Sequence, residues 1–483
     1  MRSQTRAFLA LAAAMILGIS IVAPRSQTLE VVGIVVATAV AAVAALARDA
    51  SLPALSQHAM RLMGSLGIAI GAVAFVTLQL DQFDLSHTGR VVALAIPGAA
   101  LAVGALLLVF GSRTRLGWWL LFSGHAAFVL AVIVWPVAQG AYVDVEPMQR
   151  AGIEALLSGM NPYATMIPDP YSPAASALLF ADGLSVGGIL QFGYPYPPLS
   201  LLVIAPFDWV SDFRVASAVA ALISALAIAD MGRDAVSRRA AATFLLMTPV
   251  LGMVRWGWND LLIMAVAIGI VWLVYRQSRA SSWMVGAMLA MKQYSFILVI
   301  PSLLILERPW TVKAIVRHFA KAGSVAVAVT IPFFLWGPDA FYRSVVGLHL
   351  RQSFRPDAIT LPALFPDVYG SLPKVVLIAI PLVVLGVVSV AMLLRTPTGA
   401  QGFALGSSLA LLATFLVSKQ AFGNYYVVAL GLLCAAGAAW GSSDRTDPQT
   451  VEEETPKGSD GADLSVDSAT SLGGSLERSP SED

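Results

Sequence analysis

The sequence has little charge and almost no cysteine. Only 12% of its 483 residues are charged and 57% are hydrophobic, with a mean hydropathy of +0.76. Soluble domains carry about 25% charged residues, so this composition excludes an ordinary soluble protein and indicates an integral membrane protein. The single cysteine, Cys434, excludes an intramolecular disulfide framework, and we interpret it as a packing residue.

The sequence also lacks the common motifs for nucleotides and metals. It has no Walker-type glycine loop, no GxGxxG fingerprint, no HExxH helix and no cluster of His and Cys. The triplet "DVE" at 144–146 is not a DxD-type metal motif, and no large polar domain is present to hold a nucleotide-sugar. We therefore expect no cofactor, no metal and no nucleic-acid partner.

Apolar runs of bilayer-spanning length dominate the chain. A continuous apolar run must satisfy its own backbone hydrogen bonds in lipid, which favours helices, and the alternation typical of barrel strands is absent. The sequence predicts an all-α polytopic membrane protein with a bundle of about 12–14 transmembrane helices. The runs lie at residues 7–24, 28–47, 62–80, 91–111, 116–136, 196–210, 213–230, 241–254, 259–275, 281–306, 319–336, 373–394, 402–418 and 423–440.

Composition divides the chain into three regions. Residues 1–115 are N-terminal transmembrane segments, of which the first 24 residues are interpreted as a retained signal anchor. Residues 116–440 form the transmembrane core. Residues 441–483 are predicted to be a disordered cytoplasmic tail, because 444–483 carry eleven acidic and three basic residues and few apolar ones.

Basic connections suggest which side of the membrane each loop faces. The segments 137–195 and 337–372 are predicted to face outward, and loops of this length are usually functional. The basic segment 233–239 conflicts with a simple count of spans, so either 196–210 or 241–254 is re-entrant. The connections predicted to be cytoplasmic are the N-terminus, 111–115, 276–279, 307–321 and Arg395.

A charged stretch opens the first of these outward loops. Pro147 and Gly159 suit the start and the end of a short amphipathic helix at 147–158, which is expected to lie at the membrane interface. Asp144 precedes this helix, and it is either a capping or solvated residue or a general base. Glu146 is its main competitor as the base. The polar residues expected to face water are Gln149, Arg150, Glu154 and Ser158.

Tyrosines and prolines follow in "NPY" (161–163) and "YPYPPL" (194–199). Prolines make the second segment stiff and then begin a helix. Tyr163, Tyr194 and Tyr196 are either an interfacial aromatic belt or the lining of a cleft for sugar and lipid.

Further motifs complete a recognisable order. With Asp144 and "YPYPPL", they resemble the membrane-embedded GT-C superfamily of polyprenyl-phosphate-sugar-dependent glycosyltransferases, and within it family 87, the bacterial mannosyltransferases. The resemblance covers residues 137–440 and implies that Asp144 is the catalytic base, although about five apolar runs precede it where such enzymes have one or few. The motifs are "RWGWNDLLIMA" (255–265), "AMLAMKQYSFILVIPSLLIL" (287–306), "WGPDAFYRSVVGLHLRQSF" (336–354) and "SKQAFGNYYVVAL" (418–430).

Cations on the predicted outer side suggest an anionic ligand, such as the phosphate of a lipid-linked sugar. We assign donor-phosphate binding to Lys292, His349, Arg351, Arg255 and Lys419. For Arg343 and Arg355 we favour helix capping or lipid headgroups.

The remaining candidates belong to the substrate cleft. Trp258 joins the tyrosines there, and Asp260 either pairs with Arg255 or binds substrate hydroxyls.

The expected function is inverting transfer of a sugar, most simply mannose, from a polyprenyl-phosphate donor to a lipid or glycan acceptor. The reaction would occur on the outer face of a bacterial cytoplasmic membrane. The same fold could use another sugar, such as arabinofuranose or glucose. A secondary transporter or lipid flippase is the alternative class, and it predicts internal repeats, which the sequence does not show clearly.

Overall fold

The computed structural model describes residues 2–21, 26–47, 62, 65, 86–111, 113–134 and 144–441. These residues are mainly helical, with one small sheet, which confirms the predicted all-α fold class. The acidic tail and nearly all of the expected span at 62–80 lie outside the described residues. The elements below all lie in the compact unit Met1–Asp444.

Six helices in the described part of the chain are long and apolar enough to cross a membrane. They make the chain a multi-pass membrane protein. The six are α2 (Gln27–Leu46), Val91–Leu108 within η3 (Val91–Ala95) and α5 (Ile96–Phe110), α10 (Arg214–Gly232), α15 (Val312–Trp336), α19 (Lys374–Arg395) and most of α21 (Gly423–Gly441). Shorter apolar segments are Thr5–Ser20 within α1 (Arg2–Ser20), α9 (Pro198–Val210), α13 (Asp260–Tyr275) and α20 (Ala400–Leu416).

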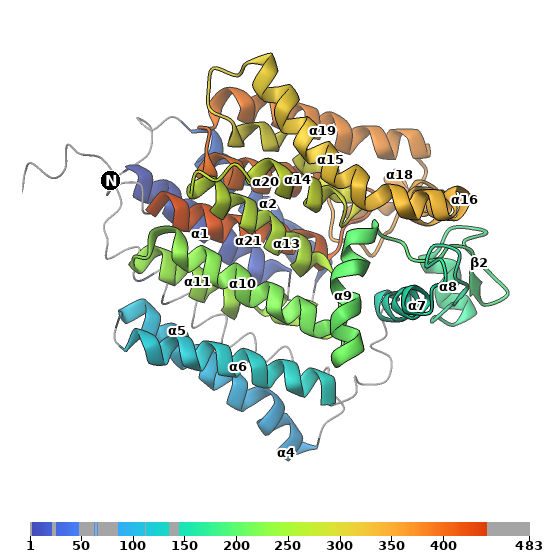
Figure 1. Ribbon diagram of the computed structural model, residues 1–483, viewed down its shortest axis with the longest axis horizontal. Helices are drawn as coiled ribbons and strands as arrows, with labels where there is room; N and C mark the ends of the chain where they lie inside the picture. Colours follow the sequence, from blue (N-terminus) through green and yellow to red (C-terminus); the bar gives the residue numbers. More distant parts are fainter. Residues whose placement is uncertain are drawn as a thin grey trace, which may run out of the picture. The chain divides into compact units, whose positions relative to one another are not determined.

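Helix α21 forms the centre of the bundle. It packs against α1, α10, α13, α20 and α11 (Ala235–Leu246), and 89% of its apolar window is buried (Figure 1). Its sequence, GNYYVVALGLLCAAGAAWG, is rich in Gly and Ala, which let helix backbones approach closely. Cys434 is buried there, as its interpretation as a packing residue requires.

Other helices present apolar surface outward. The apolar windows of α15 and α19 are only 11% and 17% buried, as suits helices that face lipid. On the other side, α6 (Thr114–Val134) pairs with α5, and this pair contacts α10 and α11 (Figure 1). The short α4 (His87–Arg90) leads into it.

Two expected spans are broken rather than continuous. The expected span at 281–306 is wrong as a single helix, because α14 (Ser281–Leu289) ends before an extended Lys292. Two 3-10 helices follow, η4 (Gln293–Leu298) and η5 (Pro301–Ile305). The expected span at 241–254 is divided between α11 and α12 (Thr248–Trp256), where Pro249 begins a new helix.

The direction of α9 bears on the conflict over the basic segment 233–239. This helix has 13 residues with Pro206 inside, so it is about 20 Å long and too short for a bilayer of about 30 Å. Figure 1 shows it running across the direction of α10 and α11. If α9 does not span, the count of spans places 233–239 on the same side as the other basic connections.

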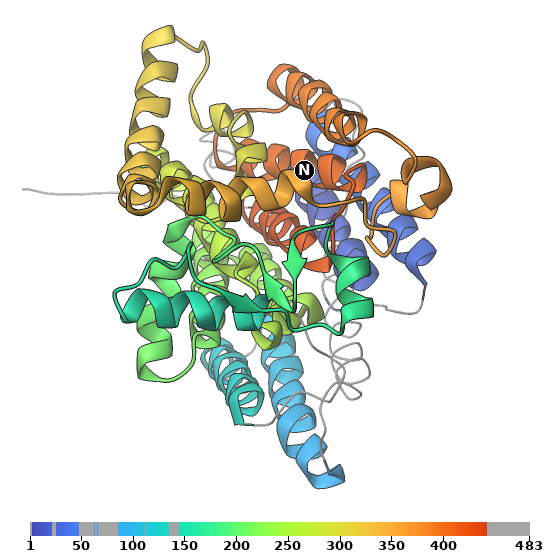
Figure 2. The ribbon, with the colours of Figure 1, turned by 90° about the vertical axis from the view of Figure 1, so that its right-hand side faces the viewer.

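The two long connections lie at the same end of the helix bundle (Figures 1 and 2). The first contains the amphipathic α7 (Val145–Leu157), α8 (Pro173–Leu179) and a small antiparallel sheet of order β1-β3-β2. Its strands are β1 (Ile167–Pro168), β2 (Ser185–Val186) and β3 (Ile189–Leu190), with Leu190 opposite Ile167 and Ser185.

The second connection contains a helical run and two short helices. The elements are α16 (Pro338–Tyr342), the π-helix η6 (Arg343–Gly347), α17 (Leu348–Arg351), η7 (Pro362–Leu364) and α18 (Pro366–Tyr369).

Helix α7 matches the amphipathic helix expected at 147–158, with one correction. Arg150 and Glu154 are exposed, as predicted. Gln149 is buried and does not face water, because its side-chain oxygen accepts a hydrogen bond from Tyr194 Oη at 3.2 Å.

Candidate active site

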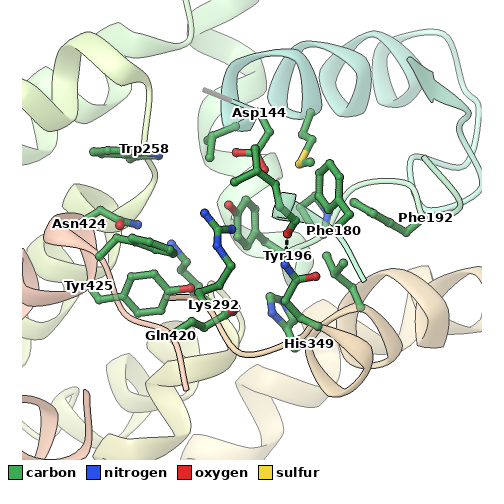
Figure 3. A pocket seen from close by; sticks show the side chains of 18 of the residues that line it. Asp144, Phe180, Phe192, Tyr196, Trp258, Lys292, His349, Gln420, Asn424 and Tyr425 are labelled. Atoms are coloured by element: carbon green, nitrogen blue, oxygen red, sulfur yellow. Dashed lines mark hydrogen bonds between the residues drawn. The ribbon is translucent and has the colours of Figure 1, made fainter. Parts of the chain in front are cut away.

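A cavity of about 310 Å³ lies where the two long connections meet the bundle (Figure 3). Its wall combines the start of α7, the segments around Tyr171 and Tyr196, the region 348–357 and the segment 420–425. Lys292 and Trp258 line it as well. Side chains far apart in the sequence therefore surround one space.

Asp144 lies on the wall of this cavity. It precedes α7 in the N-cap position, yet its side chain makes no capping hydrogen bond. Its backbone N–H donates to Tyr171 Oη at 3.2 Å. Burial raises the pKa of the Asp144 carboxyl, and the nearby Arg355 guanidinium only partly opposes this. A carboxyl with a raised pKa suits proton transfer near neutral pH.

The competing carboxylate, Glu146, has a different environment. It does not line the cavity, and it forms an ion pair with Arg150 at 3.0 Å on the outer side of α7. The geometry therefore favours Asp144 over Glu146 as a candidate base.

Lys292 contributes a positive charge to the wall. Its Nζ donates to both carboxylate oxygens of the fully buried Asp260 at 2.9 Å. Asp260 also accepts hydrogen bonds from Tyr294 Oη and, at 3.0 Å, from Asn424 Nδ2. The partner of Asp260 is thus Lys292 rather than Arg255.

Aromatic rings surround the Lys292 ammonium. Its Nζ lies 4.9 Å, 5.2 Å and 5.4 Å from the ring centroids of Tyr196, Tyr294 and Tyr425. Rings at these distances attract a cation through their π-systems. The ion pair and the rings together fix the position of this charge.

Arg355 is the second cation on the wall, and the sequence did not select it. Its guanidinium donates to both oxygens of Asp357 at 2.7 Å and 2.6 Å, and it lies 4.9 Å from the Phe422 ring centroid. A basic residue in a polar loop gives no sequence signal that separates this position from Arg343. Gln420, Asn424 and Tyr425 also line the cavity, although only Lys419 was selected from their motif.

Three predicted phosphate ligands do not line the cavity. Arg351 donates to the Asp182 carbonyl at 3.1 Å, on the protein surface. Arg255 is buried and lies over the ring of Trp256 at 4.7 Å. Lys419 donates to the backbone carbonyls of His349 and Gln352.

The predicted tyrosines divide into lining and support. Tyr196 and Trp258 line the cavity. Tyr163 and Tyr194 are buried behind it, where Tyr163 Oη donates to the Tyr196 carbonyl at 3.0 Å and Tyr194 Oη lies 2.9 Å from Ser200 Oγ. The rigid segment ends as predicted, because α9 begins at Pro198.

His349 lines the cavity opposite Asp144 (Figure 3). Burial lowers the pKa of its imidazole to about 4. Without a ligand in the cavity, the ring is therefore neutral at physiological pH.

Within the described residues, no three His, Cys, Asp or Glu side chains are grouped so that they could hold a metal ion. The fold and the cavity thus define a multi-pass membrane protein whose candidate site combines two carboxylates, Asp144 and Asp357, with two cations and aromatic rings.

Residues 194–419 match the family model of glycosyltransferase family 87. This match confirms the resemblance to family 87 over a segment a little under half the length of the chain. It includes Lys292, His349 and Arg355, whereas Asp144 precedes the matched segment.

Comparison with curated proteins gave no match. Among solved structures, ArnT from Cupriavidus metallidurans bound to undecaprenyl phosphate is similar at 16% sequence identity, with a TM-score of 0.41. The alignment covers 70% of this chain and 62% of that one, so the chain spans less than two thirds of ArnT.

Proposed function

We propose that the protein transfers a sugar from a polyprenyl-phosphate donor to a hydroxyl group of a lipid or glycan acceptor. The observation that supports this most directly is the cavity, which combines one carboxylate of raised pKa, Asp144, with the cations Lys292 and Arg355. Family 87 resemblance supports mannose as the sugar. Synthesis of the cell envelope is the process that such a reaction would serve.

The proposed reaction is a single displacement. An acceptor hydroxyl transfers its proton to Asp144, and its oxygen forms a bond to the anomeric carbon of the donor sugar. The bond from that carbon to the phosphate oxygen breaks, so the anomeric configuration inverts. The phosphate leaves on the polyprenyl chain with both electrons of the broken bond, and positive charge placed near it lowers the barrier.

Lys292 and Arg355 are our candidates for the groups that stabilise the leaving phosphate. Lys292 shares its charge with Asp260, while Arg355 holds Asp357 through two parallel hydrogen bonds. Asp357 is 54% exposed at its side chain, so Arg355 can exchange this carboxylate for a phosphate at small desolvation cost. Arg355 therefore replaces Arg351, Arg255 and Lys419 as the second phosphate ligand in this proposal.

We propose that the cavity faces the outside of the cytoplasmic membrane. The basic connections 111–115, 233–239 and 276–279 join helices whose other ends lead toward the cavity, if α9 lies along the membrane surface. Positive charge concentrates on the cytoplasmic side of membrane proteins. The cavity end is then extracytoplasmic, where lipid-linked sugars replace nucleotide-sugars as donors.

The test is sugar transfer by purified protein in lipid nanodiscs, with polyprenyl-phosphate-mannose and candidate acceptors. Asp144→Asn removes the base and keeps the shape, so we expect its rate to fall by about 10²–10⁴-fold. Glu146→Gln is the matched control and should retain activity. Equal activity of Asp144→Asn and wild type would refute the role of Asp144.

The donor is tested separately. Transfer only from another prenyl-linked sugar would correct the sugar. No transfer from any prenyl-phosphate sugar to any acceptor would refute the proposed reaction and favour the transporter alternative.

A further inference from the structure

Two side-chain polar atoms on the cavity wall have no hydrogen-bond partner among the described residues. They are Nε2 of His349 and Oε1 of Gln352, both of them buried atoms. Both residues line the cavity and are three positions apart at the end of α17. A buried polar atom without a partner is costly, so such atoms commonly await a ligand or water.

The chemistry of these two atoms indicates what they bind. The neutral imidazole of His349 interacts with the Pro195 carbonyl, which leaves Nε2 as the unprotonated nitrogen if Nδ1 carries the proton. Oε1 of Gln352 is an amide oxygen and can only accept. Two acceptors require O–H or N–H donors, which a sugar supplies through its hydroxyl groups. A phosphate supplies none, because its ionised oxygens only accept.

Both side chains are held by their surroundings. Gln352 Nε2 donates to the Leu179 carbonyl, which fixes the amide and turns Oε1 away from that bond. Lys419 Nζ donates to the backbone carbonyls of His349 at 3.0 Å and of Gln352 at 2.6 Å. Lys419 thus joins the two residues at their backbones, at the carbonyl end of α17 where a cation is favourable.

We propose that His349 and Gln352 form a subsite that recognises sugar hydroxyls, and that Lys419 is its positioning residue. This inference rests on the proposed function and revises the phosphate-binding role assigned to His349 and Lys419 from the sequence. The preceding π-helix η6 supports it, since π-turns shift the register of the side chains that follow and are frequent at functional sites.

The experiment measures kcat/KM for polyprenyl-phosphate-mannose and its four monodeoxy analogues. The variants are His349→Leu and Gln352→Met, and Leu350→Ala, on the exposed side of α17, is the control. Loss of one neutral hydrogen bond corresponds to about 3- to 10-fold. With the complete donor, kcat/KM of each variant should fall by this factor relative to wild type. With one deoxy analogue, the variant and wild type should have the same kcat/KM, because the hydrogen bond is already absent when the hydroxyl is missing.

The two sources of a sugar hydroxyl give different results. If the hydroxyl belongs to the donor, the substitution causes no further loss of kcat/KM with one of the deoxy donors. If the hydroxyl belongs to a glycan acceptor, the substitution lowers kcat/KM by the same factor with every deoxy donor, and the KM for the acceptor rises. The subsite would be overturned if wild type transfers sugar, the substitutions lower kcat/KM equally with every deoxy donor, and the acceptor KM does not change.

The role of Lys419 is read from selectivity rather than rate alone. Lys419→Met should reduce the preference for the complete donor over its deoxy analogue, and Lys419→Arg should restore it. Lys374→Met is the matched control, because Lys374 Nζ donates to the neighbouring Arg351 carbonyl at 3.0 Å. An unchanged preference in Lys419→Met would refute the positioning role.

A binding measurement separates this inference from the proposed function. Saturation-transfer NMR follows methyl α-mannoside on the intact protein without any transfer reaction. Binding that depends on Gln352, in a protein that transfers no sugar, would support the subsite and refute the function. If wild type transfers sugar, and Gln352→Met changes neither transfer nor binding, the function would be supported and the subsite refuted.

Discussion

Removal of the positive charge at Lys292 should expose the cost of a buried, unpaired carboxylate. Lys292 is 4% exposed and Asp260 is 0% exposed, so the ion pair is shielded from water. In Lys292→Met, Asp260 keeps the hydrogen bonds from Tyr294 and Asn424 but loses the ammonium that neutralises its charge. Breaking one side of a buried pair costs about 3–5 kcal/mol in free energy of unfolding.

A double variant tests the physical cause of this loss. Lys292→Met combined with Asp260→Asn removes both charges and keeps an acceptor for Asn424. The second substitution should therefore return about 2–3 kcal/mol of the stability lost in Lys292→Met, as coupling energies of contacting groups reach this size. Unfolding in mixed micelles of mild and denaturing detergent would measure the three variants against wild type.

The same set separates stability from catalysis. The double variant regains stability but still lacks the Lys292 ammonium, so sugar transfer should remain low. If the loss in free energy of unfolding of the double variant equals the sum of the losses of the two single variants, the argument from an unpaired buried charge is refuted. Full transfer activity in the double variant would remove Lys292 from the group of phosphate ligands.

Two further predictions concern the cavity and its support. Arg355→Gln removes the cation that lowers the pKa of Asp144, so the pKa of this carboxyl should rise. The acid limb of the pH profile of kcat/KM should therefore move to higher pH. An acid limb at the wild-type pH would exclude this coupling. Gly193→Ala would place a Cβ 2.5 Å from the Tyr163 carbonyl oxygen, a backbone atom that cannot swing away, so thermal stability should fall. Gly386→Ala on α19 meets nothing within 4 Å and is its control, and equal stability of the two variants would contradict the packing argument.

Several features of this protein could be predicted from local sequence. Apolar run length determines which segments can satisfy their backbone in a membrane, so the helical class and the six helices long enough to span were predictable. Proline and glycine positions predicted the amphipathic helix α7 and the start of α9. The order of motifs, rather than any one motif, carried the resemblance to family 87.

Pairing between distant residues could not be predicted in the same way. Lys292 and Asp260 are 32 positions apart, and nothing local distinguishes this pair from one between Asp260 and Arg255. The extended backbone at Lys292 interrupts an apolar run that, by hydropathy, is a single span. The length and hydropathy of this run predict neither the interruption at Lys292 nor the ion pair with Asp260 that stabilises the buried ammonium.

The sequence by itself determined that this protein is embedded in lipid. It also determined the small set of polar residues that could have a chemical role there. Only the tertiary structure decided which of them share a space. Asp144, Lys292, Arg355 and His349 meet at one cavity, while Arg351 and Lys419 turn to backbone carbonyls. The physical reason is that hydrophobic length is a property of one segment, whereas a charge in a cavity depends on every segment packed around it.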